Sequence, residues 1–566
     1  MNKEHESAGA GRETVTPFPE APLLARPLPD IVWDRASADP EGLAVVELGE
    51  RGDTTMTWRE LVDRAERIAH VLLALGVRPG ETVMVQLPNS AAFVAASLAA
   101  LRIGAVCCPV LPALGQRELE YALQRSDARV LFVPEEFRKR RYAQEVRFMA
   151  EARRTGRLAH VLVVAEDSAL AYDGDESGTG VVFHDLVRST AAARPAEHPP
   201  VLGPDTVAHL LFTSGTTGEP KGVPHRMGTL NRAALLMSRR LGLTRRDRWH
   251  IASPMAHHSG FLYGMWVALL LGGVQVLQPV WDADRALEAF TRWRSTFMQG
   301  ATPFLLDMVD AVDAGVPPPQ SLSTFVITGA SVPRALSARA RSSLGIRVCA
   351  GWGSTETCFA TLSAPGDDEE LVTATDGRSL DGVRLRVVGE AGRPLGPGDE
   401  GDLQVTGPCL FEGYLGRPDL TEEAFTADGW YRTGDLAVIE PTGYLRITGR
   451  VKDVINRGGE KIPVGDIEQL LMTHPAVRDA AVVAMPDRRL GERACLFAVL
   501  SPGGLLDLTA MQIFLEGEKV AKHYWPERVE IMDALPRNPA GKVQKFILRQ
   551  LAKGATGRRT GEDDGI

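Results

Sequence analysis

The sequence has few of the features that mark secreted or membrane-spanning proteins. Its six cysteines are scattered over 566 residues without C-x-x-C spacing, so we expect reduced thiols rather than disulfides or zinc ligands. The richest apolar run, Leu262–Leu277, is too short to span a membrane uninterrupted, because Gly264, Gly272, Gly273 and Gln275 break it. The first residues lack the apolar segment of a secretory signal, and we expect a cytoplasmic protein.

The sequence also lacks an excess of positive charge. It holds 63 Lys and Arg against 72 Asp and Glu, a formal net charge of −9. Nucleic acids and anionic membranes attract a concentrated positive field, so this balance argues against both as partners and favours a small soluble one. The basic run at residues 138–141 (RKRR) lies among acidic residues in a helix-like stretch, and we interpret it as a solvated helix face.

What the sequence does contain is an alternation of helix and strand patterns. Thr57 and Glu60 form a capping box before an apolar helical face that ends at Gly76. Short apolar runs typical of strands in a parallel sheet flanked by helices lie at residues 82–85, 130–133, 161–164 and 207–212. These patterns predict an α/β fold.

The length and a change of texture predict more than one domain, since 566 residues exceed one ordinary domain. After about residue 380 the strand-like pieces become shorter, at 382–388, 401–405 and 443–447. A smaller α/β unit follows, with a helix at 464–471 and a strand at 480–484, which places a boundary close to Arg450. Both ends of the chain are polar and unable to bury apolar surface, so we expect them to be disordered.

The strand at 207–212 leads directly into a loop rich in oxyanion donors. The loop contains Thr213, Ser214, Gly215, Thr216, Thr217, Gly218 and Lys221. Glycines let the backbone approach an anion, hydroxyl and main-chain N–H groups donate hydrogen bonds, and the lysine adds positive charge. A flexible surface turn would share this composition, but it would not explain the buried-type strand before it. The pattern favours a phosphate cradle other than a P-loop, because glycine follows the lysine.

This loop resembles the signature loop of the adenylate-forming superfamily, which includes acyl-CoA synthetases, aryl-acid AMP ligases, luciferases and the adenylation domains of nonribosomal peptide synthetases. Further segments match that family in its order, over roughly residues 30–550. They are 328–331 (TGAS), 351–356 (GWGSTE), 431–436 (YRTGDL), 449–455 (GRVKDVI), 457–462 (RGGEKI) and 536–543 (PRNPAGKV). The resemblance implies a large N-terminal AMP-binding domain with several subdomains and a small mobile C-terminal α/β domain.

The resemblance implies an ATP site with Mg²⁺. The implied nucleotide contacts are Thr213, Ser214, Gly215, Thr216, Thr217, Gly218, Lys221, Gly329, Ala330, Ser331, Gly351, Trp352, Gly353, Ser354, Thr355, Asp435, Arg450, Lys452, Gly459 and Lys542. Trp352 would stack on adenine, Asp435 would accept the ribose hydroxyls, and Glu356 would hold Mg²⁺, which prefers oxygen ligands. The implied catalytic residues are Lys542, Thr213, His257 and Glu356.

The resemblance also assigns roles around the domain boundary. Lys452 would be the pivot of a hinge, Gly459 would open a tunnel for a pantetheine thiol, and Lys542 would bridge the carboxylate and the α-phosphate. We therefore predict a tail at 1–25, the N-terminal domain at 26–449, the hinge at 450–453, the C-terminal domain at 454–552 and a tail at 553–566.

By the same resemblance, the acid pocket is bounded by His257, His258, Ser259, Gly260, Gly329, Gly351 and Gly353. Two adjacent histidines also suit zinc, but the sequence offers no third ligand near them, so we expect no zinc site. Cys358 lies close to the 351–356 motif, but no base accompanies it and we assign it no catalytic role. The family's amino-acid-activating members carry an aspartate for the substrate amine; residues 254–260 (PMAHHSG) have none, which favours a plain carboxylic acid.

The implied reaction is attack of a carboxylate on the α-phosphorus of ATP with release of pyrophosphate, followed by transfer of the acyl group to CoA. The predicted enzyme is an AMP-forming acid–thiol ligase acting on an aryl, alicyclic or short-to-medium acyl acid. One alternative is loading of a phosphopantetheinylated carrier protein, because residues 456–462 (NRGGEKI) resemble aryl-acid AMP ligases. Others are activation of an oxyanion such as nitrite, in a diazotisation, and a non-enzymatic nucleotide sensor.

Overall fold

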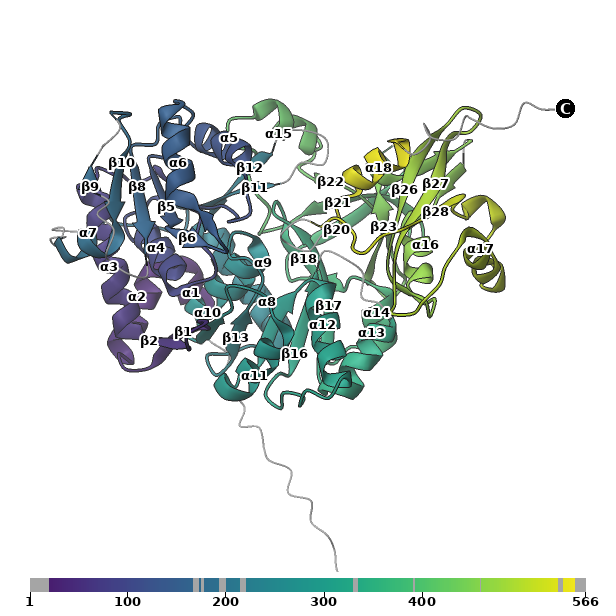
Figure 1. Cartoon of the computed structure of the whole chain (residues 1–566), viewed down its shortest axis with the longest axis horizontal. Coiled ribbons are helices and arrows are strands. Elements are labelled where there is room, and N and C mark those ends of the chain that lie inside the picture. Colours follow the sequence, from purple (N-terminus) through teal and green to yellow (C-terminus); the bar gives the residue numbers. More distant parts are fainter. Residues whose placement is uncertain are drawn as a thin grey trace, which may run out of the picture.

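A computed structural model describes residues 20–165, 173–174, 178–192, 200–213, 220–328, 334–389, 392–458, 460–537 and 543–554. Within these ranges two large, mostly parallel sheets build the N-terminal domain (Figure 1). One has the order β12 (Lys221–Arg226), β11 (Val207–Thr213), β4 (Val106–Pro109), β3 (Thr82–Val85), β5 (Val130–Pro134), β8 (His160–Val164), β10 (Val182–Asp185) and β9 (Asp173–Gly174). The other has the order β19 (Arg378–Ser379), β18 (Cys358–Leu362), β17 (Arg347–Ser354), β16 (Thr324–Thr328), β15 (Phe297–Gly300), β13 (Arg248–Ile251), β14 (Val274–Leu277), β1 (Leu43–Glu47) and β2 (Thr54–Thr57).

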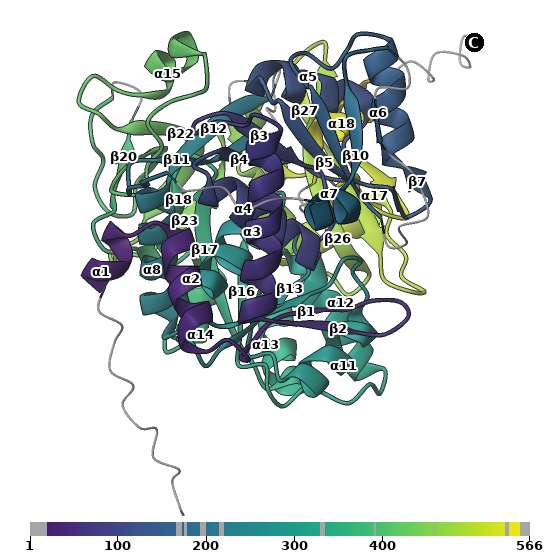
Figure 2. The same ribbon diagram turned by 90° about the vertical axis from the view of Figure 1, so that its left-hand side faces the viewer.

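Helices cover both large sheets, as expected for parallel strands joined by crossovers. They are α1 (Glu20–Ala25), α2 (Leu28–Ala38), α3 (Trp58–Ala74), α4 (Ala91–Arg102), α5 (Gln116–Ser126), α6 (Tyr142–Glu151), α7 (Leu186–Ala192), α8 (Met227–Leu241), α9 (His258–Gly260), α10 (Val267–Leu271), α11 (Ala283–Trp293), α12 (Thr302–Asp313), α13 (Arg334–Arg339) and α14 (Glu369–Ala374). Figure 2 shows α2 and α3 side by side on one face of the domain. The main hydrophobic core contains the buried α4, the segment 261–271 and side chains from both sheets. Within the described ranges, no helix has the length and apolarity to cross a membrane.

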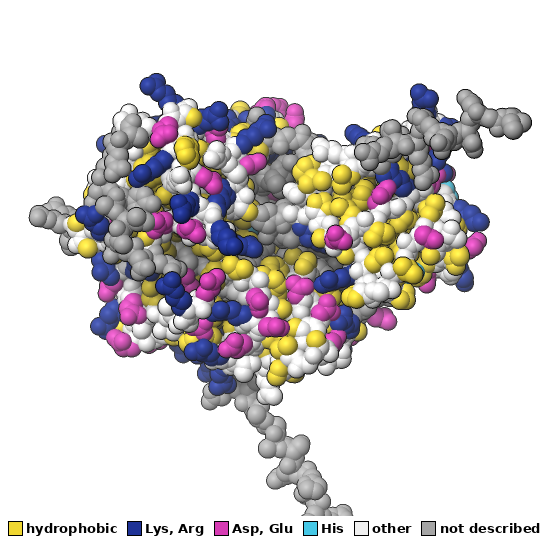
Figure 3. Space-filling view, viewed as in Figure 1, with side chains coloured by type: hydrophobic (Ala, Val, Ile, Leu, Met, Phe, Trp, Pro, Cys, Tyr) yellow, Lys and Arg dark blue, Asp and Glu magenta, His cyan; other side chains and the backbone are white. Residues whose placement is uncertain are grey.

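Two smaller sheets follow toward the C-terminus. An antiparallel sheet has the order β20 (Arg384–Val388), β21 (Glu400–Thr406), β22 (Tyr431–Ile439) and β23 (Leu445–Arg450), and α15 (Pro418–Ala424) lies between β21 and β22 in the chain. The C-terminal domain contains β24 (Ile455–Arg457), β25 (Glu460–Ile462), β26 (Val477–Asp487), β27 (Gly491–Leu500) and β28 (Arg528–Ile531), with α16 (Val464–Leu471), α17 (Leu508–Gly517) and α18 (Lys545–Gly554). Figure 3 shows the molecule hollowed between this domain and the large one.

The predicted α/β class and many predicted elements are confirmed. The expected strands at 82–85, 130–133, 161–164 and 207–212 are β3, β5, β8 and β11, and the expected helix at 464–471 is α16. The capping box before α3 is formed: the Thr57 hydroxyl accepts from the Glu60 amide, and the Glu60 carboxylate accepts from the Thr57 amide. The described strands from β20 to β27 pair antiparallel, a feature that the sequence analysis did not predict.

The interpretation of residues 138–141 as a helix face is wrong. They form a tight hairpin between β6 (Glu136–Phe137) and β7 (Arg140–Arg141), and α6 begins only at Tyr142. Arg138 and Lys139 adopt φ angles of 51° and 66° at the turn, a conformation that their side chains rarely favour. The Arg140 guanidinium binds Glu145 at 2.7 Å, so part of this charge has a structural role.

Candidate functional site

The GWGSTE motif forms the end of β17 and the turn into β18. At Gly353 an added Cβ would lie 2.0 Å from the carbonyl oxygen of Cys358, so only glycine lets the two strands approach so closely here. The Thr357 hydroxyl accepts a hydrogen bond from the Ser354 amide at 2.9 Å, and this contact closes the turn. Glu356 therefore sits at the tip of a rigid hairpin, in the turn that the sequence analysis assigns to Mg²⁺.

The carboxylate of Glu356 is buried beside two groups that sequence reasoning missed. The Tyr414 hydroxyl donates to Glu356 Oε1 at 3.0 Å, and the Tyr431 hydroxyl lies 3.4 Å from that of Tyr414. Burial raises the pKa of Tyr414 and the neighbouring Glu356 raises it further, so the phenol remains a donor. The Lys221 ammonium lies 4.6 Å from the centre of the Tyr414 ring, which brings the signature-loop lysine next to the hairpin carboxylate.

Asp435 connects the same hairpin to the antiparallel sheet. Its Oδ2 accepts a hydrogen bond from the Trp352 indole at 3.0 Å, and its Oδ1 lies 2.9 Å from Arg450 Nε. Asp435 and Arg450 are direct cross-strand partners on β22 and β23, which fixes their pairing. Each carboxylate oxygen keeps a further lone pair, so the group can still accept hydrogen bonds from a ligand. The structure thus brings together Trp352, Asp435 and Arg450 from three separate motifs.

A second carboxylate, that of the half-buried Asp376, lies close to Asp435. Its Oδ2 accepts from the Ile447 amide at 2.8 Å. Burial raises the pKa of Asp376 to about 6, the Ile447 hydrogen bond opposes this shift, and the charge of Asp435 adds to it. No motif surrounds this residue in the sequence, so its proximity to the site became visible only in the fold.

The histidine loop at 254–260 is held by contacts to its backbone. The Asn89 amide donates to the carbonyls of Ile251 and Ser253 at 3.1 and 2.9 Å and accepts from the Met255 amide at 2.8 Å. An added Cβ at Gly260 would lie 2.4 Å from the Ser253 carbonyl oxygen, so the loop folds back closely on itself. Asn89 is a further positioning residue that sequence reasoning missed.

Within this loop the two predicted histidines lie in different surroundings. His257 is half-buried and caps the short helix α9: its Nδ1 accepts from the Ser259 amide at 3.2 Å. His258 is buried behind the loop. The two histidines therefore differ in burial: His257 is half-buried at the start of α9, and His258 is buried in the protein interior.

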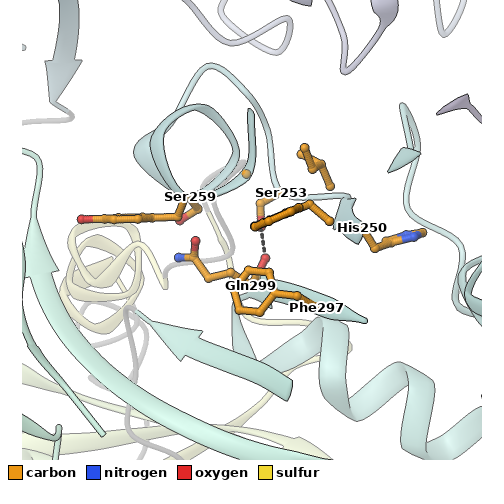
Figure 4. Close-up of a pocket in the computed structure, with 9 residues that line it drawn as sticks. His250, Ser253, Ser259, Phe297 and Gln299 are labelled. Atoms are coloured by element: carbon orange, nitrogen blue, oxygen red, sulfur yellow. Dashed lines mark hydrogen bonds between the residues drawn. The ribbon is translucent and has the colours of Figure 1, made fainter. Parts of the chain in front are cut away.

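A narrow cavity lies below the histidine loop, between the helical segment 259–264 and the neighbouring strands β13 and β15 inside the sheet (Figure 4). Its lining is Trp249, His250, Ile251, Ser253, Ser259, Tyr263, Gly264, Phe297 and Gln299. The Ser253 hydroxyl donates to the Gln299 carbonyl at 3.0 Å, and the Gln299 amide group points toward the segment that carries Ser259. Of the predicted pocket residues that the structure describes, Ser259 lines this cavity, whereas His257, His258, Gly260, Gly351 and Gly353 do not.

The segment after Arg450 leads into the C-terminal domain. Lys452 lies in a short 3-10 turn, η3 (Val451–Asp453), and burial lowers the pKa of its ammonium, with Arg450 adding to the effect. Asp453 pairs with Arg549 of α18, and Arg478 of β26 reaches Asp307 on α12 at 3.7 Å. Arg478 also lies 3.8 Å from Asp310, so it joins the C-terminal domain to α12 by ion pairs that are readily exchanged in water, whereas the Asp453–Arg549 pair holds η3 to α18.

Several predicted site residues lie outside the described ranges. They are Ser214, Gly215, Thr216, Thr217, Gly218, Gly329, Ala330, Ser331, Gly459 and Lys542. The predicted ATP-site residues that the structure describes come from β11, β12, the 351–356 hairpin, β22, β23 and η3. They are Thr213, Lys221, residues 351–356, Asp435, Arg450 and Lys452. Their ordered spacing in the sequence was the signal for this grouping.

The comparisons with known proteins agree with this geometry. Residues 32–415 match the AMP-binding enzyme family, and residues 466–542 match the AMP-binding enzyme C-terminal domain. The chain therefore belongs to the AMP-binding enzyme family, and it is an enzyme of the AMP-forming acid–thiol ligase class. The family resemblance drawn from the sequence motifs is confirmed.

Individual relatives span nearly the whole chain. A medium-chain fatty-acid–CoA ligase of Escherichia coli (strain K12) is 34% identical over 524 residues, which cover 92% of this chain and 90% of the relative. A salicyl-AMP ligase / salicyl-S-ArCP synthetase of Mycobacterium tuberculosis is 33% identical over 533 residues, covering 93% and 91%. Among solved structures, ATP-bound MatB from Rhodopseudomonas palustris superposes with a TM-score of 0.82 at 28% identity, covering 94% and 99% of the two chains.

Proposed function

We propose that the protein transfers AMP from ATP to a small carboxylic acid, releases pyrophosphate, and then passes the acyl group to the thiol of CoA. The observation that carries this proposal is the convergence of Lys221, Glu356 and Asp435, each from a different motif, around the 351–358 hairpin through Tyr414 and Trp352. These groups supply the cation, the metal-binding carboxylate and the ribose acceptor that a nucleotide requires.

Glu356 fits a magnesium ion, because it is a buried carboxylate with one hydrogen bond, from Tyr414, to Oε1. Mg²⁺ there would neutralise charge on the phosphates of ATP. The chain's own part is to orient: Asp435 and Trp352 would fix the nucleoside, and Lys221 and Lys542 would place positive charge near the phosphates. Negative groups approach each other in this reaction, so positioning and charge stabilisation are the main requirements.

The lining of the small cavity below the histidine loop favours an aryl or short acyl acid, and the side chains must move apart to admit it, because the cavity has no room for even a water molecule. Aromatic rings of Trp249, Phe297 and Tyr263 form its walls, and Ser259 and Gln299 provide polar groups. Such a narrow site with flat walls and a few polar groups suits a planar or compact acid better than a long flexible chain.

The boundary between the domains is part of the proposal. We place a hinge at residues 450–453, between an N-terminal domain at 26–449 and a C-terminal domain at 454–552. Rotation there would exchange Lys542 for Gly459 at the acyl-AMP, and thereby separate the two half-reactions in time.

The acceptor has a second candidate, a phosphopantetheinylated carrier protein. Hydrophobic side chains gather over the visible face of the C-terminal domain in Figure 3, and exposed large ones on that domain include Phe546, Leu551 and Ile531. A protein partner could cover such a surface, whereas CoA would not need it. Product analysis with CoA and with a holo carrier protein, supplied in parallel with the same acid, distinguishes the two acceptors.

Pyrophosphate exchange over a panel of aliphatic, aryl and amino acids tests the first half-reaction. We expect exchange with at least one compact aryl or short acyl acid and none with ATP alone. Lys542→Ala should abolish exchange while a preformed acyl-AMP still reacts with the thiol, because the lysine acts only in adenylation. Exchange at the wild-type rate in this variant, or no exchange with any carboxylic acid, would contradict the proposal.

A further inference from the structure

Behind the hairpin lies a cluster of buried imidazole and thiol groups that the proposed reaction does not use. His209 on β11 and His225 on β12 are direct cross-strand partners. The His258 ring lies 5.3 Å, centre to centre, from each of them, and Cys358 begins β18 nearby. All four side chains are at most 4% exposed. One potential ligand atom from each of His225, His258 and Cys358 lies within 4.8 Å of the others.

The hydrogen bonds of this cluster leave metal-binding atoms unused. His225 Nε2 lies 2.6 Å from the Thr355 carbonyl oxygen, which can only accept, so Nε2 carries the proton and Nδ1 carries the lone pair. Among the described residues, His225 Nδ1 and both ring nitrogens of His258 and His209 have no hydrogen-bond partner. Buried polar atoms normally have a hydrogen-bond partner. Five ring nitrogens without one in a single cluster therefore require an explanation.

The arrangement around His225 is the one that metal ligands typically show. A ligating histidine almost always donates its other N–H to a carbonyl or carboxylate, which fixes the ring and the tautomer. The Thr355 carbonyl provides this contact for His225. On the thiol side, the buried Tyr263 hydroxyl accepts a hydrogen bond from the amide of Phe359, the residue after Cys358.

The protonation states agree with this geometry. Burial lowers the pKa of His225 to about 4 and holds the pKa values of His209 and His258 well below the usual range, so the rings are neutral, as ligands must be. Burial raises the pKa of the Cys358 thiol, and a bound cation would reverse this by taking the place of the proton.

We propose that His225, His258 and Cys358 form a zinc site, with His209 as the neighbouring imidazole. Two nitrogens and one sulfur match the preference of Zn²⁺, which binds imidazole and thiolate at about 2.0–2.3 Å, and adjustment of the side chains would bring the three atoms around one ion. Mg²⁺ prefers oxygen, so this site is distinct from the carboxylate of Glu356. The two adjacent histidines of the sequence therefore do have partners, but only His258 takes part, and its partners lie far away in the chain.

A zinc ion here would join three segments that surround the proposed active site. His225 belongs to the strand that begins with Lys221, His258 follows His257, and Cys358 lies two residues after Glu356. The role is structural: the ion would hold the hairpin and the histidine loop against β12.

The experiment uses the full-length protein, and its first arm needs no variant. Zinc is removed with a strong chelator, and the chain is titrated with Co²⁺ in the presence of excess Mg²⁺. We expect one Co²⁺ per chain, visible absorption typical of tetrahedral cobalt and a thiolate-to-cobalt charge-transfer band in the near ultraviolet. Zn²⁺ should displace the cobalt and raise the melting temperature of the chelated protein. A folded wild-type protein without the charge-transfer band would overturn the proposal.

Variants assign the ligands. Cys358→Ser should lose the charge-transfer band and weaken binding by more than the ~10–100-fold that loss of a supporting contact costs. Cys409→Ser is the matched control, because Cys409 is an equally buried thiol near Cys358 but lies outside the triad. It should keep the band, as should Glu356→Gln, which removes the proposed magnesium ligand. An unchanged band in Cys358→Ser, or its loss in either control, would refute this ligand set.

Discussion

Replacing Tyr414 by phenylalanine removes one atom and tests how the site holds Glu356. The ring would keep its edge-on contact with Phe411, at 4.8 Å between centres, and its position under Lys221 at 4.6 Å. The change removes the hydrogen bond to Glu356 Oε1 at 3.0 Å and the longer contact with the Tyr431 hydroxyl at 3.4 Å. Hydrogen bonds to charged groups contribute about 1.5–3 kcal/mol, and this one is buried, so we expect the free energy of unfolding to fall by that amount.

Urea unfolding without nucleotide measures this loss, and Tyr431→Phe provides the comparison. The Tyr431 hydroxyl lies 3.4 Å from that of Tyr414 and makes no contact with Glu356 among the described residues, so its removal should cost about 0.5–1.5 kcal/mol. A double-mutant cycle with Glu356→Gln isolates the pairwise coupling. The expected contribution of this hydrogen bond is about 1.5–3 kcal/mol. A free energy of unfolding for Tyr414→Phe within about 0.5 kcal/mol of the wild-type value, or a larger loss in Tyr431→Phe, would contradict the assigned role of the bond.

Two further substitutions test other parts of the site. Asp376→Asn should flatten the pH dependence of stability. Because the pKa of the carboxyl is raised to about 6, the wild type loses roughly 2–3 kcal/mol of unfolding free energy as pH rises from about 4 to about 6. Urea unfolding between pH 4 and 8 should therefore show the variant more stable than the wild type by this amount above pH 6, but not at pH 4. Gly353→Ala places a Cβ 2.0 Å from the Cys358 carbonyl oxygen, so we expect a loss of about 1–3 kcal/mol and weaker ATP binding as Trp352 shifts; a wild-type melting temperature would contradict the close approach.

The sequence was sufficient for elements whose pattern is local and repeated. The apolar runs that became β3, β5, β8 and β11 are buried on both faces, so each residue carries the same signal. The N-terminus of α3 was readable because the Thr57–Glu60 box lies within four residues. The ATP-site motifs were readable for a different reason, namely that their order and spacing resemble a family.

The hairpin at 138–141 could not be predicted from the sequence. It depends on positive φ angles at Arg138 and Lys139, and neither residue type is typical of that conformation. Long-range contacts were equally hidden. Tyr414 lies in no motif, but it reaches Glu356 because the segment 411–415 crosses the hairpin, where the Phe411 amide donates to the Glu356 carbonyl. The sequence places His258 beside His257, whereas its neighbours in space are His209 and His225.

The contacts of Asp435 connect the proposed nucleotide site to the proposed hinge. Its carboxylate is shared between Trp352, on the hairpin, and Arg450, the last residue before η3. A ribose that binds Asp435 would compete with these two partners or add to them. In either case it changes how firmly Arg450 is held at the point where the chain enters the C-terminal domain. Nucleotide binding and rotation at residues 450–453 should therefore be coupled through this one carboxylate, since no other described acidic group pairs with Arg450.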